Sequence, residues 1–345
     1  MQYIRGRQIS DGGEGYICEV QGRPDLLMKV YKQKDSSGEP VVTPELIGKL
    51  AYMKEHPPIS LVSQGVIAWP IDLVYENGLF LGFVMPRLDF DEQLQRVYSY
   101  KHPDIDADEY GAYPSVSSRV GVAVNLCSAL HELHSAGYVV GDLNHENIGI
   151  NYRNAKVFFV DCDSFHIADE GGRIYRTNVI MPGYLAPEII AHCNNERADG
   201  RAYSLDKVSL PTFTRESDLF CLAIHIFKLL MNGVDPFRGV YNDAKGSVAS
   251  PFVGNEAIER GAYVFREGNR PAAVFCPTAE AIPVSMSEMF HRAFMDGGKN
   301  PRLRPDAQAW YEELMRYYNS LEQCIENPKH QYRKGLSSCP FCEAD

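Results

Sequence analysis

The stretch that decides the fold reads Tyr-Val-Val-Gly-Asp-Leu-Asn-His-Glu-Asn-Ile-Gly-Ile over 138–150 and Val-Phe-Phe-Val-Asp-Cys-Asp-Ser-Phe over 157–165. It sets Asp142 and Asn147 in the pattern Asp-x-x-x-x-Asn, and an apolar run then leads to Asp161. A carboxylate can accept a hydroxyl proton, and an amide oxygen with a second carboxylate can hold Mg²⁺. The pattern predicts strand, turn, strand and a metal-nucleotide site. The motif alone leaves a surface hairpin open as the alternative.

A glycine-rich turn near the start of the chain, Ser-Asp-Gly-Gly-Glu-Gly-Tyr-Ile over 10–17, lies between alternating polar and apolar runs. Its glycines allow backbone N–H groups to approach phosphates because no Cβ stands in the way. Lys29 follows inside the apolar strand Leu-Met-Lys-Val-Tyr, where a lysine is costly to bury without an anion. These features predict phosphate binding, while a plain hairpin turn and an edge-strand lysine are the alternatives.

Composition limits the class of protein. The chain has 345 residues with 45% hydrophobic and 23% charged side chains, which suits a globular protein with room for two packed lobes. Its net charge of −11 disfavours nucleic acid as the main partner. Residues 1–10 lack the apolar run of a signal peptide, and no apolar stretch of about 18 residues predicts a membrane span. Nine cysteines, an odd number, argue against a disulfide framework and favour a cytoplasmic location.

Other segments carry helix and strand signals. Thr43-Pro44-Glu45 predicts a helix start, followed by an apolar stripe at helical spacing. Strands are expected over 66–75 and 79–85, and a loop over 194–214. Further apolar stripes predict buried helices near 120–134, 217–230 and 310–321.

The tail carries separate chemistry in the pattern Cys-x5-His-x8-Cys-Pro-Phe-Cys. A Cys-x2-Cys knuckle supplies two thiolates to one metal, and an upstream Cys and His complete a tetrahedral site. About 20 residues cannot bury a core alone, so a metal would explain why the tail folds. The pattern predicts Zn²⁺, with a redox pair or unpaired surface cysteines as the alternative, on four ligands: Cys324, His330, Cys339 and Cys342.

In their order along the chain these motifs resemble those of protein kinases. The resemblance spans about residues 8–320 and includes the Gly-Tyr-Leu-Ala-Pro-Glu ending at Glu188, which is similar to the end of a kinase activation segment. It is strongest to bacterial eukaryotic-like Ser/Thr kinases that carry Asp-x-Asp-Ser-Phe and a Cys/His tail, found in tellurite-resistance-associated phosphorylation cassettes. It implies a two-lobed α+β kinase-like fold, with a β-rich lobe over 1–86, a helical lobe over 87–320 and a zinc-binding tail over 321–345.

The resemblance also implies roles for individual residues. Asp142 would be the base, Asn147 and Asp161 the Mg²⁺ ligands, and Lys29 the lysine for the α- and β-phosphates of ATP, paired with Glu45. Glu55 is the second candidate for that pair, and Asp163 is a rival metal ligand. Asp218 would cap the catalytic loop, and Arg304 would pair with Glu188 as a buried ion pair. The remaining nucleotide contacts would come from the turn and the hinge strand: Gly12, Gly13, Gly15, Ile17, Val84 and Met85.

Three departures from the kinase pattern affect the expected activity. Val140 and Gly141 replace His-Arg before Asp142, which removes an arginine that could receive an activating phosphate. Asn144 replaces the lysine that would contact the transferred phosphate, and Cys162-Asp163 replaces Phe-Gly. The chain is therefore expected to be a Ser/Thr protein kinase, slow or atypical, or alternatively a nucleotide-binding regulator whose zinc tail binds partners. The family resemblance implies a von Willebrand-type protein and a PP2C-type phosphatase as partners, and neither nucleic acid nor membrane.

Overall fold

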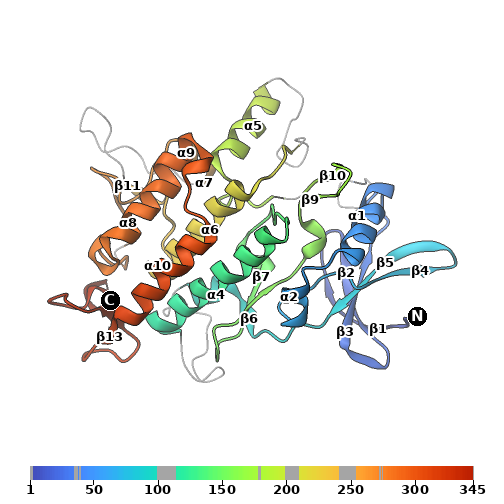
Figure 1. Cartoon of the computed structure of the whole chain (residues 1–345), viewed down its shortest axis with the longest axis horizontal. Helices are drawn as coiled ribbons and strands as arrows, with labels where there is room; N and C mark the ends of the chain where they lie inside the picture. Colours follow the sequence, from blue (N-terminus) through green and yellow to red (C-terminus); the bar gives the residue numbers. More distant parts are fainter. Residues whose placement is uncertain are drawn as a thin grey trace.

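The computed structural model describes residues 3–34, 38, 40–98, 114–177, 180–198, 210–240, 254–271, 273 and 275–344. A sheet lies at one end of the molecule and most of the helices lie at the other (Figure 1). This mixed α/β architecture confirms the expected combination of a sheet with helices, and it is consistent with a kinase-like fold. The domain boundaries given above stay predictions.

The N-terminal sheet has five antiparallel strands in the order β1-β2-β3-β5-β4. Side chains alternate between the two faces of a strand. Met28 and Val30 therefore join a small apolar cluster on one face, whereas Lys29 and Tyr31 point to the opposite face, where Tyr31 belongs to the main core. The strands are β1 (Arg5–Asp11), β2 (Gly15–Val20), β3 (Arg23–Tyr31), β4 (Asp72–Glu76) and β5 (Leu79–Pro86).

Two helices accompany this sheet (Figure 1). Helix α1 (Pro44–Glu55) begins where the sequence predicted, since the Thr43 hydroxyl accepts a hydrogen bond from the Leu46 amide at 3.1 Å. Helix α2 (Ile59–Ser63) follows it. The Trp69 indole N–H donates to the Met53 carbonyl at 2.7 Å and so fastens the end of α1 to the chain that enters β4.

Long buried helices form the core of the other end. Helix α4 (Val116–Ser135) packs against α6 (Arg215–Leu230) and α10 (Ala307–Ser320). Rings from α6, α8 and the turn after it stack or meet edge to face, as between Phe227 and Phe290 at 5.2 Å. Such aromatic pairs add about 0.5–1.5 kcal/mol each beyond the area they bury. In the described part of the chain, no helix is both long and apolar enough to cross a membrane.

Short elements connect this framework. The three-stranded sheet β6-β7-β8 carries the loops of the candidate site. It consists of β6 (Glu92–Gln93), β7 (Ile148–Ile150) and β8 (Val157–Phe159). The others are η1 (Leu94–Val97), η2 (His145–Asn147), η3 (Cys162–Ser164), β9 (Ile167–Ala168), β10 (Ile174–Tyr175), α5 (Pro187–Ala198), β11 (Gly239–Val240), α7 (Gly254–Glu259), β12 (Arg270–Pro271), η5 (Ala279–Ala281), α8 (Val284–His291), η6 (Arg292–Asp296, a π-helical turn), α9 (Gly297–Lys299) and η7 (Pro301–Leu303).

Two of the sequence predictions need correction. The strand expected over 66–75 begins only at Asp72, because Ile67 instead bridges to Phe159 and Pro70 lacks an amide hydrogen for a sheet ladder. The loop expected over 194–214 is wrong at its start, because α5 continues to Ala198; residues 199–209 lie outside the described part. The other expected helices are present, with α6 starting at Arg215 behind a capping box from Thr214.

The tail folds as a hairpin, β13 (Leu321–Gln323) with β14 (Gln331–Arg333), followed by α11 (Pro340–Ala344). It lies against the start of α4, where the Val116 amide donates to the Lys329 carbonyl at 3.2 Å. Phe341 in α11 is fully buried, and its ring lies 5.9 Å from the guanidinium of Arg119 on α4. The tail is therefore packed onto the helical part of the protein.

Candidate active site

Lys29 lies in the middle of β3, between Ile17 on β2 and Phe83 on β5. Its ammonium nitrogen is 2.6 Å from Asp161 Oδ1 and 2.7 Å from Asp163 Oδ2. Burial alone would lower the pKa of Lys29, but attraction by Asp163 and Asp161 raises it well above its usual range. Lys29 is therefore a permanent cation at the site.

Asp161 follows β8 and has a left-handed backbone, with φ of 55° and ψ of 41°. Few residues other than glycine adopt this conformation, although aspartate does so more easily than most, and it often marks functional sites. The preceding residue is fixed by a hydrogen bond from the Val160 amide to the Asn147 carbonyl at 3.0 Å. Burial and the neighbouring Asp163 raise the pKa of the Asp161 carboxyl.

Asp163, rather than the expected glutamate, is a partner of Lys29. Its Oδ2 accepts hydrogen bonds from Lys29 and from the Tyr31 hydroxyl at 2.5 Å, while its buried Oδ1 has no hydrogen-bond partner within the described residues. Burial alone would raise the pKa of Asp163, but the attraction of Lys29 lowers it, so the carboxylate stays ionised. The two rival metal ligands thus share one lysine.

The predicted pair between Glu45 and Lys29 is wrong. Glu45 is exposed in the first turn of α1, and Glu55, the second candidate, is exposed near its end beside Lys54. Lys49 reaches the site from α1 instead, and its amine donates to the Asp163 carbonyl at 2.6 Å. Burial lowers the pKa of Lys49 to about 8, although Asp163 opposes the shift.

Lys49 could have been found in the sequence. It lies three residues after Leu46 and four before Met53, on the same helical stripe as the apolar residues that predicted α1. Lysine at such a position is costly to bury unless a partner accepts its hydrogen bonds. The partner itself was not predictable, because Asp163 is 114 residues away in the chain.

Asp142 and Asn147 lie together, as their spacing predicted. The Asn147 amide nitrogen donates to Asp142 Oδ2 at 3.3 Å and to the Asp142 carbonyl at 3.1 Å, which turns the amide oxygen away from Asp142. Asn144 donates to the same carboxylate oxygen at 2.9 Å, and its own oxygen caps the turn η2. Burial raises the pKa of Asp142 to about 6, with the hydrogen bond from Asn144 opposing the shift.

Asp218 fixes the backbone immediately before Asp142 through hydrogen bonds. Its two carboxylate oxygens accept hydrogen bonds from the Val140 and Gly141 amides, at 2.8 and 2.9 Å, and His134 contacts it at 3.0 Å. Gly141 has a φ of 78°, and a Cβ there would lie 2.3 Å from the Thr177 hydroxyl. This explains why the chain carries glycine immediately before the candidate base.

The glycine-rich turn joins β1 to β2. The Gly12 amide donates to the Gly15 carbonyl at 2.8 Å, which closes the turn. A Cβ at Gly15 would lie 2.4 Å from the Val30 carbonyl, so this glycine is required by the neighbouring strand. Gly13 has open space around it, so crowding does not explain why this residue is glycine. Access for the phosphates of a ligand would explain it.

The predicted adenine contacts at Val84 and Met85 need correction. Val84 lies inside the sheet between Met28 and Asp72, and its carbonyl already accepts a hydrogen bond from the Ile71 amide at 2.8 Å. Met85 pairs with Leu27 in the same ladder. The backbone of both residues therefore takes part in the sheet, which does not support an adenine-binding role for them.

Arg304 and Glu188 form the expected ion pair with two parallel contacts, Nη1 to Oε1 and Nη2 to Oε2, each 2.7 Å. Arg304 also donates to the carbonyls of Glu216 and Gly297, at 2.7 and 2.8 Å. The Arg304 side chain is fully buried whereas that of Glu188 is 33% exposed, so breaking the pair should cost less than the ~3–5 kcal/mol typical of a fully buried pair. The pair fixes the start of α5 to the helical core.

A buried polar network lies under the loop that carries Asp142, and it was not predicted. The Tyr98 hydroxyl lies 2.7 Å from His225 Nδ1, and His225 Nε2 lies 3.0 Å from the Leu143 carbonyl, next to Asp142. On the other side, the Tyr98 carbonyl accepts a hydrogen bond from Arg119 at 2.9 Å. The network therefore runs from the loop towards the tail, where Phe341 faces Arg119.

The four tail residues that the sequence singled out meet in one cluster, with their ligand atoms within 4.8 Å of one another. Cys342 Sγ lies 3.5 Å from Cys324 Sγ and 3.4 Å from His330 Nδ1, and Cys339 Sγ lies 3.9 Å from the same nitrogen. Tetrahedral zinc with Zn–S distances of about 2.3 Å requires ligand atoms about 3.5–3.8 Å apart. None of the three cysteines is in a disulfide, and the donor set fits zinc.

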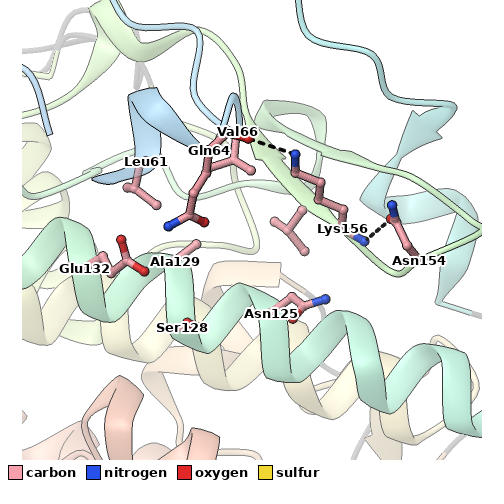
Figure 2. A pocket seen from close by; sticks show the side chains of 10 residues that line it. Leu61, Gln64, Val66, Asn125, Ser128, Ala129, Glu132, Asn154 and Lys156 are labelled. Carbon is pink, nitrogen blue, oxygen red and sulfur yellow. Dashed lines mark hydrogen bonds between the residues drawn. The ribbon is translucent and has the colours of Figure 1, made fainter. Parts of the chain in front are cut away.

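A separate pocket of about 270 Å³ lies between α2, α4 and the turn after Asn154 (Figure 2). Figure 2 shows Lys156 crossing it, with hydrogen bonds to the Gln64 carbonyl and the Asn154 side chain, both 2.9 Å. None of the residues predicted for nucleotide or metal binding lines it. This pocket is therefore distinct from the candidate active site.

Two curated proteins that are named protein kinase are similar to this chain. No family model matches the chain. The chain is 28% identical over 356 aligned residues to the protein named protein kinase YegI of Escherichia coli strain K12, and 27% identical to the protein of that name from Escherichia coli O157:H7. Each alignment covers 99% of this chain and 48% of the relative, so the chain spans about half the length of the curated relatives it matches.

Proposed function

We propose that the chain is an ATP-dependent protein kinase that transfers the γ-phosphate to a serine or threonine hydroxyl of a protein partner. The observation that carries the proposal is the convergence of one lysine, two aspartates and an Asp-Asn pair at the end of β8 and the loop before β7. Similarity to proteins named protein kinase extends over nearly the whole chain and supports it.

The residues at the site fit Mg²⁺ and a nucleotide. Asp163 Oδ1 is a buried carboxylate oxygen without a hydrogen-bond partner in the described part of the chain, and Asp161 is only half-buried on a strained backbone. Asn147 and Asp161 would hold Mg²⁺, with Asp163 as the alternative ligand, while Lys29 and the glycine-rich turn would bind phosphates. When bound, Mg²⁺ neutralises charge on the phosphates and ATP supplies the transferred group.

Asp142 is suited to accept the hydroxyl proton. Its pKa of about 6 leaves the carboxylate ionised at neutral pH but keeps it more basic than a surface aspartate. The hydrogen bonds from Asn144 and Asn147 fix the orientation of the carboxylate. Asp218 fixes the backbone immediately before it.

Asn144 favours a second candidate function, a nucleotide-binding regulator. Its amide donates to Asp142 and leaves no cation at the position where a kinase lysine would stand. Lys49 is the other buried cation nearby, and its described hydrogen bond goes to the Asp163 carbonyl. A regulator would therefore keep nucleotide binding without phosphate transfer.

One experiment separates the two functions. The purified chain is incubated with Mg²⁺, ATP labelled at the γ-phosphate and a generic acceptor protein, and nucleotide binding is measured in parallel. Label on serine or threonine of the acceptor supports the kinase. Binding without transfer supports the regulator. If the chain neither binds nucleotide nor transfers label, both proposals are contradicted.

For the tail, the converging thiols and imidazole support a structural zinc ion that joins the β13–β14 hairpin to α11. Elemental analysis that finds about one zinc per chain would support it. The family resemblance also supports a von Willebrand-type protein and a PP2C-type phosphatase as partners. Co-purification of each with the full chain tests them.

A further inference from the structure

A pocket of about 510 Å³ lies in the helical part of the protein, on the side of α4 where that helix ends. It is bordered by the end of α4, the first turn of α6, the π-helical turn η6 and the chain that enters α10. None of the residues assigned above to nucleotide, metal or zinc lines it. Its volume falls in the range of about 300–1,000 Å³ that ligand pockets occupy.

Four arginines from three segments of the chain line this pocket: Arg215, Arg292, Arg302 and Arg304. The first three are exposed, whereas Arg304 is buried and bonded to Glu188. The described hydrogen bonds of Arg215 and Arg292 go to carbonyls, those of His134 and Leu303, rather than to carboxylates. Such a cluster of arginines is unexpected in a chain with a net charge of −11.

The carboxylates that line the pocket do not neutralise these arginines completely. Asp306 caps α10 by accepting from the Ala309 amide at 2.8 Å. Burial alone would raise the pKa of Glu216, but hydrogen bonds at the start of α6 and the attraction of Arg302 and Arg304 lower it. One carboxylate therefore faces two guanidiniums, and Arg215 and Arg292 keep donors for an outside anion.

A second arginine-rich hollow shows the difference. It has a volume of about 550 Å³ and is lined by Arg5, Arg7 and Arg87. There Glu19 lies 3.3 Å from Arg7 and 3.2 Å from Arg87, and Arg5 donates to the Tyr16 hydroxyl. In that hollow a carboxylate forms direct ion pairs with two of the three guanidiniums, whereas none of the ion pairs among the described residues involves Arg215, Arg292 or Arg302.

Two more observations mark the first pocket as a built site. Arg304 Nε is buried and has no hydrogen-bond partner among the described residues, although the other nitrogens of this side chain have partners. Arg292 begins a π-helical turn, an irregularity that is frequent at functional sites. Guanidiniums bind phosphate and carboxylate through two parallel hydrogen bonds, and several around one pocket favour the dianion.

We propose that this pocket binds a phosphate monoester, carried either by a phosphorylated side chain of a protein segment or by a free small molecule. Arg215, Arg292 and Arg302 supply charge-assisted hydrogen bonds to the phosphate oxygens. Arg304 links the pocket to Glu188 at the start of α5. The proposal does not depend on phosphate transfer at Asp142, because binding here can be measured without nucleotide.

The test uses the full chain and three probes: inorganic phosphate, free O-phosphoserine and a short phosphoserine peptide. Binding is followed by isothermal titration at low ionic strength, because salt screens such contacts. We expect dissociation constants in the millimolar range or tighter. The double variant Arg292→Ala/Arg302→Ala should weaken binding at least tenfold, since both side chains are exposed and the fold should persist.

A matched control is Arg5→Ala/Arg7→Ala in the other hollow, which should leave phosphate binding unchanged. Thermal unfolding checks that each variant is folded, and Arg292→Gln/Arg302→Gln replaces the alanine pair if it is not. Tighter binding of the peptide than of free phosphoserine assigns a protein segment, whereas equal affinity assigns a small ester, and both support the pocket. Absence of binding, or binding that the pocket variants leave unchanged, would overturn the proposal.

Discussion

The candidate active site and the Cys/His tail hold their polar side chains in opposite ways. At the active site, lysine and aspartates already pair with each other, with Lys29 bonded to Asp161 and Asp163. In the tail, the polar atoms are three sulfurs and one imidazole nitrogen, and contacts between them are 3.4–3.9 Å long. The candidate active site can therefore stay folded without its ligands, whereas in the tail a bound metal would hold the four ligand atoms together.

The largest expected effect tests the active-site half of this comparison. Asp142→Asn keeps the shape of the side chain and removes the base, so phosphate transfer should fall about 10²–10⁴-fold, the usual contribution of general base catalysis. Nucleotide affinity and zinc content should stay close to those of the unmodified chain. Transfer is measured with labelled ATP, and Asp25→Asn, at an exposed pair with Arg23, serves as control. Transfer at the original rate would refute Asp142 as the base.

The second prediction concerns the tail. Cys339→Ser removes one of four ligands, so the chain should lose its zinc and about 3 kcal/mol or more of stability, as expected when a structural metal site is broken. Elemental analysis and chemical denaturation measure the two effects. Cys276→Ser, at a cysteine outside the cluster, is the control. Full zinc content in Cys339→Ser would contradict the four-ligand site.

The pH dependence of transfer gives a third, smaller effect. Burial raises the pKa of Asp142 to about 6, and the base must be ionised, so kcat/KM should fall about tenfold for each pH unit below 6. The sign for stability is the reverse, because a raised carboxyl pKa means that ionisation favours unfolding between the ordinary value of 3.8 and about 6. A flat profile between pH 5 and 7 would exclude Asp142 as the titrating base.

The smallest effect sharpens the comparison inside the active site. Lys49→Met removes the hydrogen bond to the Asp163 carbonyl but also removes a costly buried charge, so the net loss should be about 1 kcal/mol, or about fivefold in nucleotide affinity. Nucleotide titration measures it. Lys54→Met on the same helix is the control, because Lys54 pairs with Asp72 near the surface. A change in zinc content would show that the two regions are not separate.

The two regions also differ in how far the sequence predicted them. The four predicted zinc ligands lie within 19 residues of one another, and the spacing of thiols and imidazole is itself the signal for a metal. The positions of Asp142, Asn147 and Asp161 followed from short-range spacing around two strands. The partner of Lys29 did not, because the contact to Asp163 spans 134 residues and depends on how the loop after β8 turns back.

Resemblance to a family also misplaced some contacts for a physical reason. Glu45 carried the acidic charge expected in α1, but at this position the helix faces solvent, and Lys49 faces the site instead. The acid that pairs with Lys29 in place of Glu45 is Asp163, at a position where the kinase pattern that the chain resembles has glycine. Helix α1 thus contributes a lysine, and the loop after β8 contributes the acid. This arrangement is visible only when both elements are placed in space.

The bridge made by Lys29 has a consequence for how the site fills. The site holds its own counter-ion, since one ammonium group already balances part of the charge of two aspartates. A divalent cation could reach the unpartnered Asp163 Oδ1 without displacing that ammonium, but its charge would repel Lys29, whereas the phosphates of a nucleotide would offer Lys29 a new anion at the same moment. We therefore expect metal and nucleotide to bind much more tightly together than either binds separately.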